Sequence, residues 1–287
     1  MSWMVEVAAF FSRILPDKIK EKIYQNKPLA GAIRESLNAS VAEGFQQVEV
    51  AAGILTGMPL LLDLKGEKDY WLGTYEMPLQ AALKELVKAG MVCYDVGANI
   101  GYVSLMLARL SGETGKVVAF EALPDNVKRW VANVDLNGLM DRTELYPLAV
   151  TQWGTPARFL VHASAGMGKL EGSPGRADST MYKKTIEVPS ISLDQFIYQQ
   201  GNVKPDLVKM DIEGGEVFAL PGMERTLKEH HPILLLELHG PEASRFTWEF
   251  LKGLGYQISW MKPDFPPVES LDQLEWKSYL VARHGEV

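Results

Sequence analysis

The sequence predicts an α/β fold built around a mostly parallel sheet. Short apolar runs alternate with segments of helical spacing, several of these runs end in an acidic residue, and glycines follow at the turns. Strands that alternate with helices form parallel sheets through right-handed crossovers. Because such sheets bind ligands at the carboxyl ends of their strands, we expect the acidic strand ends to lie together at one site.

The best-defined strand, turn and helix lie at residues 92–110. An apolar strand carries Asp95 near its end, and a turn with Gly97 and Gly101 leads into the helix. This order is typical of the first unit of a nucleotide-binding fold. Glycine at these two positions permits a sharp turn and the close approach of a ligand or a strand. Asn99 is expected to cap the helix by accepting a hydrogen bond from a free amide.

The acidic residue of this unit bears on the identity of the nucleotide. A dinucleotide such as NAD would place its pyrophosphate at the turn, where Asp95 would repel it by roughly 4 kcal/mol at about 4 Å and an effective dielectric constant near 20. S-adenosylmethionine (SAM) carries a sulfonium and an ammonium group and no phosphate. Asp95 therefore favours SAM, with the ammonium near its carboxylate, directly or through water. Glu121 ends the next strand, where a carboxylate can bind ribose hydroxyls.

Length and composition restrict the function classes. The 287 residues suffice for one large α/β domain with an extension. The net charge of −7 and the lack of a basic tract argue against a nucleic-acid substrate. Cys93 is the single cysteine, which leaves no internal disulfide and fits a reducing cytoplasm. No apolar run approaches the roughly 20 residues that cross a bilayer, and the start of the chain is not a clear signal peptide.

Residues 1–66 are expected to form an N-terminal cap, followed by the main domain at 67–287. Apolar residues within 1–25 have helical spacing, and 45–50 and 58–64 alternate like the paired strands of a hairpin. Four roles remain open for the helical part. It can pack on the main domain, pair with a second subunit in a homodimer, cover the substrate or contact a membrane surface.

The main domain continues the alternation to its end. A glycine-rich segment at 163–184 has few apolar anchors and is predicted to be a mobile loop and a candidate lid. Glu76 lies beside a helix start, where a carboxylate is favourable for local reasons and where ligand contact is an equal alternative. The expected strands cover 116–121, 143–148, 159–161, 186–189, 207 to about 211, 233–239, 256–261 and 278–283. The expected helices cover 78–88, 124–137, 193–200, about 216 to 228 and 244–254.

Several blocks of this sequence resemble the FkbM-type SAM-dependent methyltransferases. The blocks are 95–101; 120–124 with Asn133 and Asn137 downstream; and 208–216, with weaker matches at 73–76 and 192–194. The resemblance extends over about residues 60–260. It departs from the family at Ala122, where proline is usual, beside a backbone position and not a functional side chain.

The resemblance implies a class I Rossmann-like methyltransferase fold, with a mostly parallel seven-stranded sheet and helices on both faces. It also implies O-methyl transfer to a hydroxyl of a sugar, a polyketide or a related metabolite. The turn from Gly97 to Gly101 would then hold the methionine end of SAM, and Glu121 its ribose. A non-catalytic SAM-binding protein of this fold and an NAD-dependent oxidoreductase remain as alternatives.

A second set of acidic residues carries the expected chemistry. Asp211 and Glu213 project to the same side of their strand end, and so do Glu237 and His239, so the four groups cluster if the two strands are neighbours. Asp211 and Glu213 are expected to be catalytic, and Asp211 also to contact the cofactor. His239, with an ordinary pKa near 6.5, is the natural proton acceptor, although it can also be a hydrogen-bonded turn residue. Asp211, Glu237 and His239 could alternatively hold Mg²⁺, which would lower the pKa of a bound hydroxyl.

Overall fold

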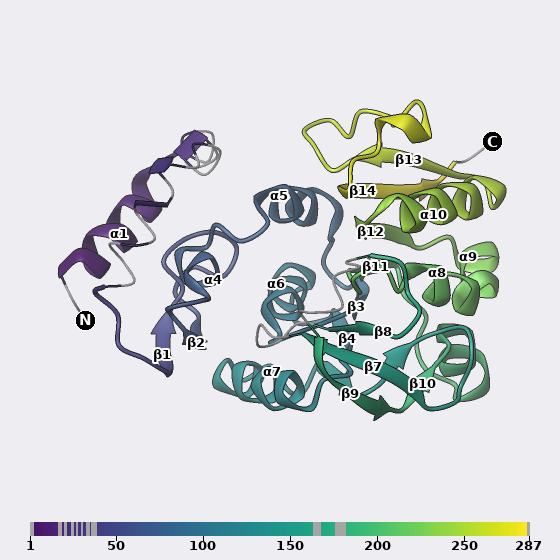
Figure 1. Cartoon of the computed structure of the whole chain (residues 1–287), viewed down its shortest axis with the longest axis horizontal. Coiled ribbons are helices and arrows are strands. Elements are labelled where there is room, and N and C mark those ends of the chain that lie inside the picture. The colour runs from purple at the N-terminus through teal and green to yellow at the C-terminus, as the bar shows by residue number, and fades with distance from the viewer. Residues whose placement is uncertain are drawn as a thin grey trace.

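The structure is a computed structural model, which describes residues 3–16, 19, 22–23, 26, 28–29, 31–32, 35, 39–162, 168–175 and 182–285. At its centre is a seven-stranded sheet with the order β13-β14-β12-β11-β3-β4-β5 (Figure 1). The strands are β3 (Val92–Val96), β4 (Lys116–Phe120), β5 (Thr143–Tyr146), β11 (Leu207–Met210), β12 (Ile233–His239), β13 (Tyr256–Trp260) and β14 (Lys277–His284). β14 is antiparallel to both of its neighbours, and the other pairs are parallel. The predicted mostly parallel α/β sheet is confirmed.

The order of the strands fixes where a ligand can bind. β3 lies between β4 and β11, so the chain runs outward from β3 in one direction and returns to its other side later. A crevice forms at the carboxyl ends of the strands on either side of such a reversal. β3 and β11 are therefore the two strands whose ends should border the site.

Helices cover both faces of this sheet, as expected from strands that are buried on each side. Cys93 and Tyr94 are neighbours on β3, yet each belongs to the apolar core on a different face, because side chains alternate along a strand. Leu105 of α6 packs on the first face, and Leu251 of α10 on the second. The helices that cover the two faces are α5 (Met77–Leu86), α6 (Tyr102–Ser111), α7 (Pro124–Leu136), α8 (Glu216–Ala219), α9 (Glu224–His230) and α10 (Pro241–Gly253).

Two expected helices differ in form from the prediction. The helix expected up to residue 228 is divided into α8 and α9 by a 3₁₀ turn at Pro221–Met223, because proline cannot continue a regular helix. The segment expected as a helix at 193–200 is instead a short π-helix, Gln195–Gln199.

The N-terminal region contains the predicted hairpin of β1 (Phe45–Glu49) and β2 (Pro59–Asp63), preceded by α1 (Trp3–Ile14) and followed by an unpredicted helix, α4 (Lys68–Leu72). α1 lies on the opposite side of the molecule from β13 (Figure 1). Asn133 Oδ1 accepts a hydrogen bond from the Leu61 amide at 2.7 Å, and Asn137 Nδ2 donates to the Pro59 carbonyl at 2.9 Å. These two family-motif asparagines thus fasten the hairpin to α7. Part of the helical cap lies outside the described residues, and the boundary at residue 66 stays a prediction.

The predicted loop at 163–184 needs correction where it is described. β8 (Gly168–Leu170) and β9 (Tyr182–Val188) both pair antiparallel with β7 (Ala157–His162) in a small sheet of order β8-β7-β9. Backbone pairing with β7 organises these residues in spite of their glycines. Residues 163–167 and 176–181 lie outside the described residues. A further short parallel pair joins β6 (Ala149–Val150) to β10 (Ser190–Ile191).

None of the helices in the described parts of the chain combines the length and the apolar character that a membrane span requires.

Candidate active site

A cavity of about 320 Å³ opens at the carboxyl ends of β3, β4, β11 and β12. Its lining contains many of the residues that the sequence singled out. These are Gly97, Asn99, Glu121, Asp211, Glu213, Glu237 and His239. Gly101, Asp95 and Glu76 are not part of this lining. The parallel topology therefore brings together acids that are far apart in the chain, as predicted.

The glycines of the turn are required by the packing around them. Gly97 has a φ of 83°, and a Cβ atom there would lie 2.0 Å from the Asp211 carbonyl oxygen. Gly101 has a φ of 90°, and its Cβ would lie 3.0 Å from the Trp130 ring. The end of β11 and a core tryptophan therefore leave little room for a side chain at Gly97 and Gly101. The predicted cap was wrong: the N-cap residue of α6 is Gly101, no side chain caps the helix, and the Asn99 amide donates to Glu121.

Asp95 is completely buried beneath the turn. Its Oδ2 accepts a hydrogen bond from Ser104 at 2.6 Å, and its Oδ1 lies 3.7 Å from Lys209 Nζ. Burial raises the pKa of Asp95, although Lys209 and Ser104 oppose this shift. The expected direct contact with a ligand ammonium is therefore not available in this structure. Lys209 also neutralises the Asp95 carboxylate, so the expected repulsion of a pyrophosphate by Asp95 does not hold.

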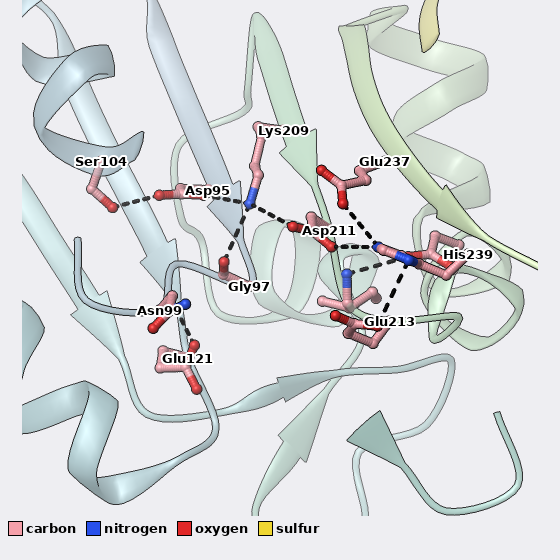
Figure 2. A network of polar contacts seen from close by, with 12 residues as sticks. Asp95, Gly97, Asn99, Ser104, Glu121, Lys209, Asp211, Glu213, Glu237 and His239 are labelled. Atoms are coloured by element: carbon pink, nitrogen blue, oxygen red, sulfur yellow. Dashed lines mark hydrogen bonds and ion pairs between the residues drawn. The ribbon is translucent and has the colours of Figure 1, made fainter. Parts of the chain in front are cut away.

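Lys209 is the site residue that the sequence analysis missed. Its ammonium lies 3.3 Å from the Gly97 carbonyl oxygen and 3.9 Å from Asp211 Oδ2, besides Asp95 (Figure 2). Burial disfavours its charge, but Asp95 and Asp211 outweigh that effect and raise the pKa of Lys209. Lys209 stays charged and ties the turn to the end of β11. A lysine inside an otherwise apolar buried strand was the signal that could have revealed it.

Glu121 stands at the end of β4 with both oxygens facing backbone amides. Oε2 accepts from Asn99 and Oε1 from Leu123, each at 2.8 Å. Burial raises the pKa of Glu121, while these two amides favour the charged form. The Asn126 side chain also hydrogen-bonds this carboxylate, which is thus held rigidly at the cavity wall with part of its lone-pair capacity left for a ligand hydroxyl.

Glu76 occupies the predicted place beside a helix start, since α5 begins directly after it. Its side chain does not cap the helix, and it borders a separate small cavity together with Lys209 and Glu237. Burial, followed by the charges of Glu237 and Asp211, raises the pKa of Glu76 well above its usual value. The structure does not bring Glu76 to the wall of the main cavity, so ligand contact stays a prediction.

The predicted four-residue cluster forms because β11 and β12 are neighbours. His239 Nε2 lies 3.1 Å from Glu237 Oε1 and 3.3 Å from Asp211 Oδ1, and its Nδ1 lies 3.7 Å from Glu213 Oε2 (Figure 2). Lys277, at the start of β14, pairs with the same oxygen of Glu237, Oε1. A buried imidazole is thus surrounded by three carboxylates.

The three carboxylates change the pKa of His239. Burial alone lowers the pKa of His239, but its hydrogen bonds with Asp211 and Glu237 outweigh this effect and raise the pKa to about 10. His239 is therefore an imidazolium at neutral pH. A proton acceptor must be unprotonated before it can act, so this pKa argues against the predicted role of His239 as the base, and that role stays a prediction.

Asp211, Glu237 and His239 also have the spacing of a metal site. One ligand atom from each lies within 4.8 Å of the other two. A hard cation would suit the two carboxylates. The positive charges of His239 and Lys277 already neutralise these two carboxylates, however, so the same geometry is explained without a metal. Metal binding stays a prediction.

Comparison with known proteins decides the family. A family model described as the methyltransferase FkbM domain matches residues 95–258, which is more than half of the chain. The chain belongs to the FkbM methyltransferase family. It is therefore a SAM-dependent methyltransferase, with the class I fold that the resemblance implied. Membership of this family excludes the alternative of an NAD-dependent oxidoreductase.

This methyltransferase is also similar to individual proteins. The hexuronic acid methyltransferase AglP of Haloferax volcanii is 28% identical over 212 residues, which cover 73% of this chain and 77% of that protein. A methyltransferase FkbM from Methylobacillus flagellatus is 15% identical with a TM-score of 0.42, covering 92% of this chain and 60% of that one. A SAM-dependent O-methyltransferase from Thermotoga maritima has the same identity and TM-score, covering 73% and 64%. The strand order and the family match, not these distant structures, establish the fold.

Proposed function

We propose that this methyltransferase transfers the methyl group of SAM to a hydroxyl oxygen of a sugar or a related small metabolite. The observation that carries the proposal is that one cavity contains both Glu121 with the glycine turn and the cluster around His239. Donor and acceptor can therefore meet within one cavity. The hexuronic acid methyltransferase of Haloferax volcanii supports a sugar as the acceptor.

The donor end of the cavity consists of the turn Gly97–Asn99 and Glu121. Glu121 binds the ribose hydroxyls, and such charge-assisted hydrogen bonds contribute roughly 1.5–3 kcal/mol each. The turn holds the methionine end. α6 begins without a side-chain cap, so its first amides are available to the methionine carboxylate.

The acceptor end of the cavity consists of Asp211, Glu213, Glu237 and His239. The acceptor oxygen attacks the methyl carbon, the carbon–sulfur bond breaks, and its electron pair stays on sulfur. The three atoms must lie in line, so positioning supplies much of the acceleration. We assign the acceptor proton to the carboxylate of Asp211, which His239 holds in place, with Glu213 beside it. The proton then leaves to solvent.

A paired activity and binding experiment tests these roles. Asp211→Asn is expected to lower kcat by about 100-fold or more, the usual contribution of a positioned base, while SAM affinity by calorimetry falls much less. His239→Gln should lower kcat less than Asp211→Asn does, because the Asp211 carboxylate remains and only the side chain that holds it in place is changed. The matched control is Asp194→Asn, at a carboxylate that binds backbone amides outside the cavity lining. Full activity of the Asp211 variant would contradict the assignment.

Acceptor choice is proposed to depend on segments added to the common sheet. Phe159 of β7 and Gly168 and Leu170 of β8 line the cavity, although they belong to the small antiparallel sheet. The proposed cap at 1–66 and the segment 163–184 are the other candidates, since specificity in shared folds is carried by such additions. Exchanging β7 and β8 with those of another family member should change the preferred acceptor and leave SAM affinity unaltered.

A further inference from the structure

A wall of three tyrosines lines the cavity and has no part in the roles assigned above. Tyr70, Tyr75 and Tyr102, here called the tyrosine wall, are all cavity residues. Their ring centroids lie 4.2 Å (Tyr70–Tyr75), 4.8 Å (Tyr70–Tyr102) and 5.8 Å (Tyr75–Tyr102) apart, with interplanar angles from 40° to 82°. The rings therefore pack on one another and form a continuous aromatic surface.

The tyrosine wall stands beside the donor end. Tyr102 opens α6 and directly follows Gly101 of the turn. Tyr70 comes from α4, and Tyr75 from the turn after it, so both lie before the segment 95–258 that matches the family. The N-terminal region thus completes a surface next to the place assigned to the methionine end of SAM.

The tyrosine wall also carries a polar group that needs a partner. The Tyr102 side chain is only 2% exposed, yet its hydroxyl has no hydrogen-bond partner within the described residues. Buried hydroxyls are almost always hydrogen-bonded, and one left without a partner is costly. Burial raises the pKa of Tyr102, so the hydroxyl stays protonated and acts as a donor. A ligand in the cavity would supply the acceptor.

The charges at the donor end leave a cationic ligand with no free carboxylate beneath the turn. Asp95 is enclosed and paired with Lys209, so its charge is already neutralised. Aromatic faces attract cations through the negative face of the ring, by about 0.5–1 kcal/mol when exposed and about 2 kcal/mol when desolvated.

We propose that the tyrosine wall binds the sulfonium of SAM by cation–π attraction and thereby distinguishes the charged donor from its neutral product, S-adenosylhomocysteine. This inference rests on the donor site in the proposed function. Methyl transfer removes the positive charge from sulfur. The attraction to the wall ends with the reaction, which favours exchange of product for donor.

The test compares the dissociation constants of SAM and S-adenosylhomocysteine by calorimetry in matched variants. Tyr75→Leu removes a ring face, and we expect about 3- to 30-fold weaker SAM binding with little change for the product. Tyr75→Phe keeps the face and should keep the wild-type ratio of the two constants. Tyr102→Phe removes the hydroxyl only and should weaken both ligands equally. Tyr146→Leu, at a half-buried tyrosine of β5 that does not line the cavity, is the control.

Each outcome has a defined meaning. An unchanged ratio of the two constants in a Tyr75→Leu protein that unfolds at the wild-type temperature would overturn the inference. A higher KM for the acceptor with an unchanged ratio would assign the tyrosine wall to the acceptor instead. If Tyr75→Leu were the one variant that lost the binding of both ligands, Tyr75 would have a structural role, and this result would also overturn the inference. Failure of the wild-type protein to bind either ligand would refute the proposed donor site itself.

Discussion

The two ends of the cavity differ in how their charges are satisfied. At the donor end, Asp95 is paired with Ser104 and Lys209, and both oxygens of Glu121 accept backbone amides. At the acceptor end, His239 meets three carboxylates. Its Nδ1 and Glu237 Oε2 are buried without a hydrogen-bond partner within the described parts of the chain.

The difference indicates that the two ends do different work. Backbone amides and the Lys209 ion pair hold the two donor-end carboxylates in place before the donor arrives, which reduces the cost of positioning it, although Asp95 Oδ1 and the Tyr102 hydroxyl have no hydrogen-bond partner within the described residues. At the acceptor end, the polar atoms that have no partner can form hydrogen bonds with a bound hydroxyl, and such bonds are strong in a buried site. The predictions that follow test each end, from the largest expected effect to the smallest.

Glu121→Ala should abolish SAM binding at the donor end. The loss of two charge-assisted hydrogen bonds to the ribose costs about 3–6 kcal/mol, or more than 100-fold in the dissociation constant. Calorimetry measures the affinity, and circular dichroism checks that the protein stays folded. Glu144→Gln, on the neighbouring strand β5 and outside the cavity lining, is the control. An unchanged affinity of the Glu121 variant would remove the ribose role.

Lys209→Met should destabilise the protein by about 3–5 kcal/mol, because it leaves the buried charge of Asp95 without its partner. Urea unfolding measures the effect. The double variant Lys209→Met with Asp95→Asn should recover most of the stability, since it removes both charges together. If the single and the double variants are equally unstable, the ion pair is not what holds the turn to β11.

Glu216→Gln should stabilise the protein in a pH-dependent way. Glu216 is fully buried at the start of α8, and burial raises its pKa from 4.5 to about 7. Its charged form is disfavoured in the folded protein, so wild-type stability falls as the pH rises from about 4.5 to 7. The variant should gain about 3 kcal/mol above pH 7 and nothing below pH 4.5. Unfolding free energies at pH 4.5 and 8 measure this, and equal gains at both would contradict the buried charge.

Removal of divalent metal ions should have no effect at the acceptor end. His239 and Lys277 already balance Asp211 and Glu237, so methyl transfer by protein dialysed against EDTA should equal that of untreated protein. Millimolar Mg²⁺ should likewise leave the unfolding temperature unchanged, since bound metal would raise it. Activity lost to EDTA and restored by Mg²⁺ would show instead that Asp211, Glu237 and His239 hold a cation.

Much of the fold followed from the sequence because the signals are local. The alternation of strands and helices, the hairpin at 45–64 and the closing strands β13 and β14 were predicted from apolar periodicity alone. The convergence of Glu121, Asp211 and His239 was also predicted, because parallel strands end at one edge of a sheet. In the small sheet, the predicted strands at 159–161 and 186–189 lie in β7 and β9, whereas β8 and the first residues of β9 were missed, because their backbone pairing with β7 is not revealed by glycine-rich sequence.

The sequence by itself determined the kind of fold, the place of the site and most of the residues that line it. Only the tertiary structure decided the protonation and the partners of those residues. Lys209 stands directly opposite Asp95 in the register of β11 and β3, and this pairing converts a presumed ligand group into a structural one. Carboxylates from two strands surround His239 and raise its pKa. Charge states depend on neighbours in space, and a sequence does not list those neighbours.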